Sequence, residues 1–428
     1  MARPQLELPA DAPGVPARRA ALKLLDAVLR QGKALEAALD RAAANLPAND
    51  RGLAHAIAAE VLRFLSDLDA LIDSATRNRI PDDAKARFAL RIALAQVLRL
   101  GTPPHAAIST VLPLVDGGPR KLVHGVFGAL MRQGVTLPET PALPDPAALR
   151  WEAQHGSAMV EAAMAAIAQP PATDLTLADP AATDEWVAKL EGVSLFPGHV
   201  RLPAGKQITA LPGFDAGAWW VQDLAASLPA RLLGKGEGNA LDLCAAPGGK
   251  TLQLASQGWR TIAVDMSESR LARLRDNLGR TRLEAEIVCA DLREWKPAAP
   301  ADAVLLDAPC SATGIFRRHP DVLHRVRPSL IAETAALQRE LLGRAAEWVR
   351  VGGRLVYAVC SLERSEGEEQ VADFLGRHRH FAIDPVGQAE LPAGVAPNPD
   401  GTVRTLPGML ADQGGLDGFF IARMIRTA

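Results

Sequence analysis

Two cysteines in this chain are placed where a nucleophile would be expected. Cys310 follows the hydrophobic segment 303–307, and Cys360 ends the hydrophobic segment 354–360. Both segments have the apolar, β-branched composition of buried strands, and ligands of open α/β sheets bind beyond the carboxyl ends of the strands. A thiolate at such a position can attack a substrate covalently. We therefore predict that Cys310 and Cys360 are catalytic and share one cleft.

The other cysteines do not suggest chemistry by themselves. Cys244 and Cys289 fall inside predicted strands, where a cysteine is usually a small buried hydrophobe. The four cysteines lack the paired CxxC spacing of a zinc site, and the N-terminus lacks a secretory pattern. No apolar run reaches the ~18 residues of a membrane span. The sequence thus predicts a reduced, cytoplasmic protein with no metal site and no membrane contact.

A glycine turn follows the strand predicted over 240–244 and leads into a helix. Such a turn lets a ligand approach the backbone and the free N–H groups of the helix start. A nucleotide-phosphate loop is the alternative interpretation, but Cys244 stands where the Walker pattern needs a glycine. The turn is Cys244, Ala245, Ala246, Pro247, Gly248, Gly249 and Lys250. We predict that it binds a cofactor.

Three aspartates end successive predicted strands, at Asp265, Asp291 and Asp307. An acidic residue about 20 residues past the glycine turn suits the two hydroxyls of an adenosine ribose, which is the role predicted for Asp265. Asp291 could reach the adenine. A single aspartate is more often a cap or turn residue. Three in register predict a nucleoside-containing cofactor.

The elements that must position these residues fall into four segments. Residues 16–133 show only helical periodicity, and 134–148 form a proline-rich linker. Residues 149–213 are predicted to be a small α/β lead-in, with a helix over 149–168 and a strand over 207–211. From 214 to 428, strands alternate with helices, which favours a doubly wound Rossmann-like sheet. Its last strand, 419–426, is predicted to be antiparallel.

Net charge gives no argument for a nucleic-acid partner, because it is only −2. A local basic run does follow the Cys310 segment. A charge run is usually a solvated face, but at the mouth of a cleft it favours phosphate contacts. The predicted RNA-contacting residues are Arg317, Arg318, Arg325 and Arg327.

Three motifs together resemble the NOL/NOP/Sun family of RNA cytosine-C5 methyltransferases: DLCAAPGGKT, DAPCSATGIFRRHPD and AVCS. The similar part spans roughly 151–426. The resemblance implies S-adenosyl-L-methionine as cofactor, bound by residues 244–250, Asp265, Asp291 and Asp307. It also implies that Cys360 attacks carbon 6 of the cytosine and that Cys310 assists product release. Glu366 is a departure, since an asparagine is expected near that position.

The N-terminal half resembles a NusB-like RNA-binding domain, through DRGLAHAIAAEVLRF, GTPPHAAISTVLPLV and KLVHGVFGALMR. This domain followed by the methyltransferase is the arrangement of the bacterial Fmu/Sun branch of the family, which implies 16S (small-subunit) rRNA as substrate. Two alternatives remain: a tRNA or another rRNA site, and an RNA-binding module with a degenerate methyltransferase fold. The intact Cys310 and Cys360 argue against the second.

Overall fold

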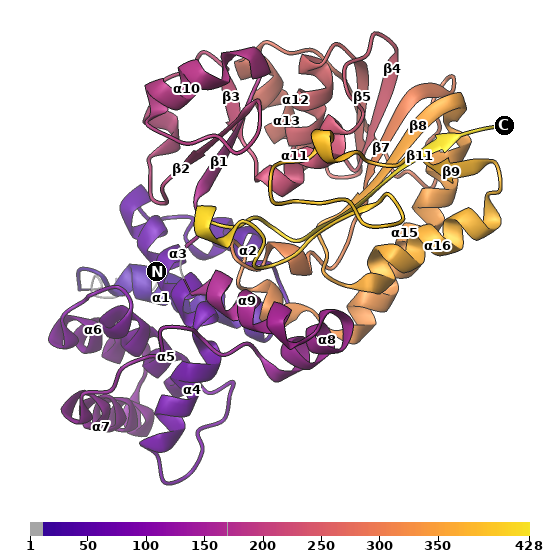
Figure 1. The fold of residues 1–428 in the computed structure, drawn as a ribbon. Helices are drawn as coiled ribbons and strands as arrows, with labels where there is room; N and C mark the ends of the chain where they lie inside the picture. The colour runs from indigo at the N-terminus through magenta and orange to yellow at the C-terminus, as the bar shows by residue number, and fades with distance from the viewer. Residues whose placement is uncertain (1–11, 169) are drawn as a thin grey trace, which may run out of the picture. The chain divides into compact units, whose positions relative to one another are not determined.

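The computed structural model describes residues 12–168 and 170–428. These residues form two compact units (Figure 1). The N-terminal unit contains the described residues up to Ala148 and, from much later in the chain, His319–Arg325. The second unit contains the rest, Leu149–Arg318 and Val326–Ala428, apart from residue 169.

The N-terminal unit is helical, as predicted. Its central helix α5 (Lys85–Leu98) is buried on all sides from residue 86 to residue 96, so its two arginines are buried as well. Arg87 and Arg91 can lie there because Asp69 and Asp73 bond to their guanidinium groups at 2.6–3.1 Å. The other helices are α1 (Val15–Leu29), α2 (Leu35–Ala42), α3 (Ala48–Arg63), α4 (Leu65–Ser74), α6 (Pro104–Val111), α7 (Gly117–Gln133) and α14 (Val322–Arg325).

The lead-in segment differs from the prediction in two places. The single helix predicted over 149–168 is two helices, α8 (Asp145–His155) and α9 (Ser157–Ile167), because Gly156 between them has φ 85°. The strand predicted over 207–211 is instead a short 3-10 turn, Ile208–Ala210. The antiparallel sheet has the order β2-β1-β3. Its elements are β1 (Thr173–Leu177), α10 (Thr183–Leu190), β2 (His199–Leu202) and β3 (Trp219–Val221).

The large sheet has the strand order β10-β11-β8-β7-β4-β5-β6, and β9 pairs with β11. Its central strands are parallel, and β11 runs antiparallel to β8, as the sequence predicts. The strands are β4 (Asn239–Leu243), β5 (Arg260–Asp265), β6 (Glu286–Cys289), β7 (Ala301–Asp307), β8 (Val349–Val359), β9 (Phe381–Ile383), β10 (Val403–Thr405) and β11 (Phe419–Arg426). The helices are α11 (Leu224–Arg231), α12 (Gly249–Ser256), α13 (Glu268–Thr281), α15 (Pro328–Glu347) and α16 (Glu368–Arg377).

Alternate residues of each central strand pack on opposite faces of this sheet, which is why the strands read as continuous apolar runs. In β4, Leu241 and Leu243 join the core beneath α15 and α16, whereas Ala240 joins the core beneath α11 and α12. Figure 1 shows α15 and α16 on one face and α11, α12 and α13 on the other. The sheet is therefore covered on both faces, as in doubly wound folds.

The direction in which successive strands are added to this sheet changes at β4. The chain proceeds from β4 to β5 and β6 on one side, then crosses to β7 and β8 on the other. Helices after β4 and β7 thus leave on opposite faces, and a crevice opens at the carboxyl ends of these two strands. The predicted cofactor turn and both predicted catalytic cysteines follow strands around this point.

Candidate active site

The glycine turn after β4 packs closely against helix α13. Gly248 caps α12 with φ 110°, and a Cβ added to it would lie 2.3 Å from the Leu274 Cδ1 atom of α13. Only glycine fits both the backbone conformation and the space. The turn is also tied to β5, since the Ala246 N–H donates to the Asp265 carboxylate at 3.1 Å.

A cavity of about 320 Å³ adjoins this turn. Cys244, Asp265 and Asp291 line it together with Pro309, the residue before Cys310. The structure thus brings three of the predicted cofactor residues around one space at the carboxyl ends of the strands. Of the other turn residues, Ala245 and Ala246 are buried and Pro247 is exposed.

The lining suits an adenosine group. The Asp265 carboxylate can accept hydrogen bonds from ribose hydroxyls, and Met266, which is 71% exposed, adds apolar surface beside it. Arg293 forms hydrogen bonds to Asp291 and lowers the pKa of that carboxyl to about 2, so the group is ionised at neutral pH. The cavity therefore offers an apolar wall with acceptors at its edge, which fits a purine nucleoside.

Lys250 and Asp307 form an ion pair beside this cavity, with Nζ 2.7 Å from Oδ2. Burial by itself would lower the pKa of Lys250, but the Asp307 carboxylate outweighs it and the pKa is raised. The ammonium group therefore stays charged. Cys360 also interacts electrostatically with Lys250.

The two predicted catalytic cysteines, Cys310 and Cys360, are in contact. Their Sγ atoms are 3.4 Å apart, and β7 and β8, the strands that they follow, are paired in parallel. A backbone hydrogen bond joins the two loops, from the Gly314 N–H to the Cys360 carbonyl at 3.0 Å. The hydrogen bond with Cys360, together with burial, raises the pKa of the Cys310 thiol well above its usual value. Cys310 is therefore protonated at neutral pH.

The sequence analysis did not assign a role to two buried carboxylates just after Cys360. Glu363 is 1% exposed and accepts hydrogen bonds from Arg150, Trp151 and Gln154 of α8, at 2.9–3.0 Å. Glu366 is fully buried and bonds to the Cys310 loop. The one signal in the sequence that could have indicated these two residues is the high glutamate content after Cys360.

Two of the arginines predicted to contact RNA, Arg317 and Arg318, instead form hydrogen bonds with aspartates of the protein, and this corrects the prediction for them. Arg317 is 3% exposed and donates to the Asp417 carboxylate at 3.1 Å. Arg318 is held between Asp417 and Asp223, at 3.1 and 2.6 Å. The Arg317 guanidinium group is therefore enclosed and is not presented to phosphates. The Arg318 side chain is 23% exposed, but two buried aspartates balance its charge.

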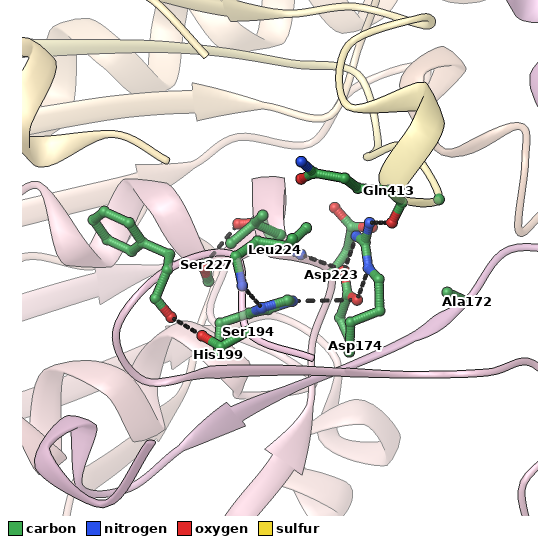
Figure 2. Close-up of polar contacts among 12 residues, drawn as sticks. Ala172, Asp174, Ser194, His199, Asp223, Leu224, Ser227 and Gln413 are labelled. Carbon is green, nitrogen blue, oxygen red and sulfur yellow. Dashed lines mark hydrogen bonds and ion pairs between the residues drawn. The ribbon is translucent and has the colours of Figure 1, made fainter. Parts of the chain in front are cut away.

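The same cluster of charges continues into the lead-in sheet. Asp174 of β1 accepts two hydrogen bonds from Arg201 of β2, at 2.7 and 2.8 Å, and the Leu224 N–H donates to it at 3.0 Å. His199 lies 3.2 Å from the same carboxylate (Figure 2). This cluster joins the loop after Cys310 to the small sheet, so its role is structural.

The other two arginines differ from each other. Arg325 belongs to the N-terminal unit and bonds to Asp321 at 2.9 Å, while its side chain is 18% exposed. Arg327 precedes α15 and is exposed. Arg327 is thus the one of the four that the structure leaves open to a phosphate.

Two further findings concern the described residues as a group. None of their helices is long and apolar enough to cross a membrane. Nor do they contain a group of three or more histidine, cysteine or acidic side chains placed to hold a metal ion.

Comparisons with known proteins agree with this geometry. The family model for the 16S rRNA methyltransferase RsmB/F matches residues 231–425, and the NusB family model matches 15–132. The ribosomal RNA small subunit methyltransferase B of Klebsiella pneumoniae is 34% identical, over 96% of this chain and 98% of its own. That of Pseudomonas syringae pv. tomato is 33% identical, over 96% and 97%. The chain belongs to this rRNA methyltransferase family.

Solved structures show the same fold. A methyltransferase homolog protein from Pyrococcus horikoshii has a TM-score of 0.55 at 25% identity and covers 70% of this chain and 98% of its own. NSun6 from the same organism has a TM-score of 0.57 at 19% identity, over 67% and 98%. The family and the predicted fold class are thereby confirmed. S-adenosylmethionine is accordingly the cofactor of this rRNA methyltransferase.

Proposed function

We propose that this rRNA methyltransferase methylates carbon 5 of a cytosine in 16S rRNA through a covalent bond between Cys360 and carbon 6. The observation that carries this proposal is the pair of thiols 3.4 Å apart, at the ends of adjacent strands β7 and β8. They lie beside the cofactor cavity, whose lining includes Pro309. A methyltransferase acting on a nucleophilic amine would need neither thiol.

The chemistry explains why two thiols are useful. Carbon 5 of cytosine is a weak nucleophile, but addition of a thiolate to carbon 6 makes it enamine-like. S-adenosylmethionine, when bound, supplies the methyl group as an electrophile. The carbon 5 proton must then leave to a base, and the electron pair it leaves behind expels the Cys360 thiolate from carbon 6. The product is 5-methylcytosine, and the enzyme's cysteine is regenerated.

The two cysteines suit different steps. We propose that the Lys250 ammonium group assists the attack by Cys360, with which it interacts electrostatically. Cys310 remains a thiol, because its hydrogen bond to Cys360 and its burial disfavour the charged form. We assign attack to Cys360 and assistance in release to Cys310. We also propose that Asp307, which forms an ion pair with Lys250, contacts the cytosine.

The substrate class rests on the relatives, which are named for the small ribosomal subunit. We propose 16S rRNA on that ground and the NusB-like unit as an RNA-binding domain. Arg327 is our candidate for a phosphate contact, because it is exposed near the Cys310 segment in the sequence. Arg325 is the weaker candidate, since Asp321 already pairs with it.

A comparison of single-cysteine variants tests the mechanism. Each variant is incubated with 16S rRNA and S-adenosylmethionine and analysed on denaturing gels. Cys360→Ala should give neither 5-methylcytosine nor a protein–RNA adduct, since no thiolate adds to carbon 6. Cys310→Ala should accumulate the adduct, because attack and methyl transfer proceed but release stalls. Cys289→Ala, which changes an exposed cysteine on β6, is the control and should behave as the unaltered enzyme.

The same experiment separates the alternatives. An adduct in Cys360→Ala and none in Cys310→Ala would reverse the roles of the two cysteines. Replacing 16S rRNA by tRNA or 23S rRNA tests the substrate, with bisulfite sequencing as the readout. Failure to bind S-adenosylmethionine by calorimetry, with no product on any RNA, would instead indicate a binding module without activity.

A further inference from the structure

We propose that Glu366 is a positioning residue for both active-site cysteines: its buried carboxylate ties together the loops that carry Cys310 and Cys360. This inference rests on the proposed function, in which the two thiols act in one reaction. Glu366 ends a 3-10 turn, Arg364–Glu366, six residues after Cys360, and none of its surface is exposed.

Each oxygen of this carboxylate contacts a residue that directly follows a catalytic cysteine. The Ser311 N–H donates to Oε1 at 2.9 Å, and the Ser311 hydroxyl donates to Oε2. The Ser361 hydroxyl also donates to Oε2. A single side chain therefore bridges the residue after Cys310 and the residue after Cys360. Because serine and cysteine are adjacent in each loop, this bridge restrains the separation of the two Sγ atoms.

Helix α15 supplies the remaining contacts of the carboxylate. The Thr334 hydroxyl and the Gln338 side-chain amide donate to Oε1 at 2.5 and 3.1 Å. Gln338 also donates to the Pro309 carbonyl at 2.8 Å, which holds the Cys310 loop a second time. All five donors on Glu366 are neutral: one backbone N–H, three hydroxyls and one amide. The negative charge is thus solvated by hydrogen bonds and is not neutralised by an ion pair.

An unneutralised buried charge also acts on the neighbouring thiols. Glu366 is among the groups that raise the pKa of Cys310, after the hydrogen bond with Cys360 and burial. Tyr357 also interacts electrostatically with Cys310, and its pKa is raised chiefly by burial. Lys250 interacts electrostatically with Cys360. The Glu366 carboxylate therefore helps to hold Cys310 as a thiol.

The experiment compares two substitutions of this residue. Glu366→Gln keeps the shape and can keep the contacts, because the serine hydroxyls can turn to accept from the new amide, but it removes the charge. Glu366→Ala removes both. Asp373→Asn on α16 is the matched control: it also removes a carboxylate, but one that is partly exposed and paired with Arg377. Circular dichroism establishes which variants fold.

The decisive readout uses no RNA and no cofactor, so it is independent of the proposed reaction. Iodoacetamide labels each cysteine, and mass spectrometry follows the four peptides separately between about pH 7 and pH 10. In Glu366→Gln the alkylation rate of Cys310 at about pH 8 should rise, because removal of the negative charge lowers the pKa of this thiol and so increases its thiolate fraction. Cys289 should react at an unchanged rate in every variant, and Asp373→Asn should match the unaltered enzyme throughout.

Turnover provides the second readout. Glu366→Ala should lower kcat by at least about tenfold with KM for RNA changed by less than about twofold, because the thiols and not the RNA surface are displaced. Unchanged Cys310 alkylation in a folded Glu366→Gln enzyme would overturn the charge role, and an unchanged kcat in Glu366→Ala would overturn the positioning role. If Glu366→Ala does not fold, the glutamine variant still decides the charge role. Absence of 5-methylcytosine in the unaltered enzyme would refute the proposed function alone.

Discussion

Replacement of Arg317 by methionine distinguishes a buried structural arginine from a phosphate-binding one. Arg317 donates to Asp417 Oδ1 from Nε and Nη2, both at 3.1 Å, and to the Gly414 carbonyl at 3.0 Å. Its Nη2 also lies 3.4 Å from Asp223. Methionine retains most of the apolar volume of the arginine side chain but has no positive charge. Arg318 is then the cation that remains paired with both Asp417 and Asp223. Breaking a buried pair by removing one partner costs about 3–5 kcal/mol, against a typical total stability of about 5–15 kcal/mol.

The loss should depend on pH. Burial raises the pKa of Asp417 to about 6, even with both arginines in place. An acid whose folded-state pKa exceeds its unfolded value binds its proton more tightly when folded, so its contribution to stability is greatest at low pH and is lost as the pH rises through about 6. Removal of the Arg317 cation raises this pKa further. Arg317→Met should therefore be more destabilised at about pH 8 than at about pH 5, relative to the unaltered protein.

Tryptophan fluorescence during urea unfolding reports on the second structural unit, which contains Arg317. All seven tryptophans lie in that unit, between Trp151 and Trp348. The urea midpoint at pH 8 should fall by about 1 M or more, with an unchanged slope. Arg327→Met is the matched control, since Arg327 is exposed, and it should change stability by less than about 0.5 kcal/mol. An unchanged midpoint for Arg317→Met, together with a raised KM for RNA, would refute the structural role and restore the phosphate contact.

Three further outcomes follow from the site. Asp265→Ala should weaken S-adenosylmethionine binding roughly 10–150-fold in calorimetry, since hydrogen bonds to a charged group contribute about 1.5–3 kcal/mol, and an unchanged Kd would exclude Asp265 from the ribose site. Gly314→Ala should disrupt the active-site loops, because its Cβ would lie 1.9 Å from the Gly418 carbonyl oxygen. The control is Gly343→Ala in α15, whose Cβ would meet no atom closer than 4.0 Å. In the same urea assay this control should stabilise the fold by about 0.4–1 kcal/mol. Arg327→Met should lower the slope of log affinity for RNA against log salt by about 0.7–0.9, as expected for one lost phosphate contact, and an unaltered slope would remove Arg327 from the RNA surface.

The sequence by itself determined the fold class and the family, because both depend on local patterns. Helical periodicity without strands in the first third, and strands alternating with helices from 214 onward, specify elements whose apolar faces leave few ways to pack. Residues at strand ends, such as Cys310 and Cys360, are predictable for the same reason: parallel strands deliver them to one edge. The structure places their sulfur atoms 3.4 Å apart.

Only the tertiary structure decided which charged residues are free to bind a ligand. Arg317 belongs to a basic run in the sequence, yet its partners Asp223 and Asp417 lie 94 and 100 residues away. Glu366 follows Cys360 by six positions, but its contact with Ser311 spans 55 residues. The reason is physical: the sequence records a side chain's charge and local conformation, whereas its exposure and its partners are set by distant segments that meet only when the chain folds.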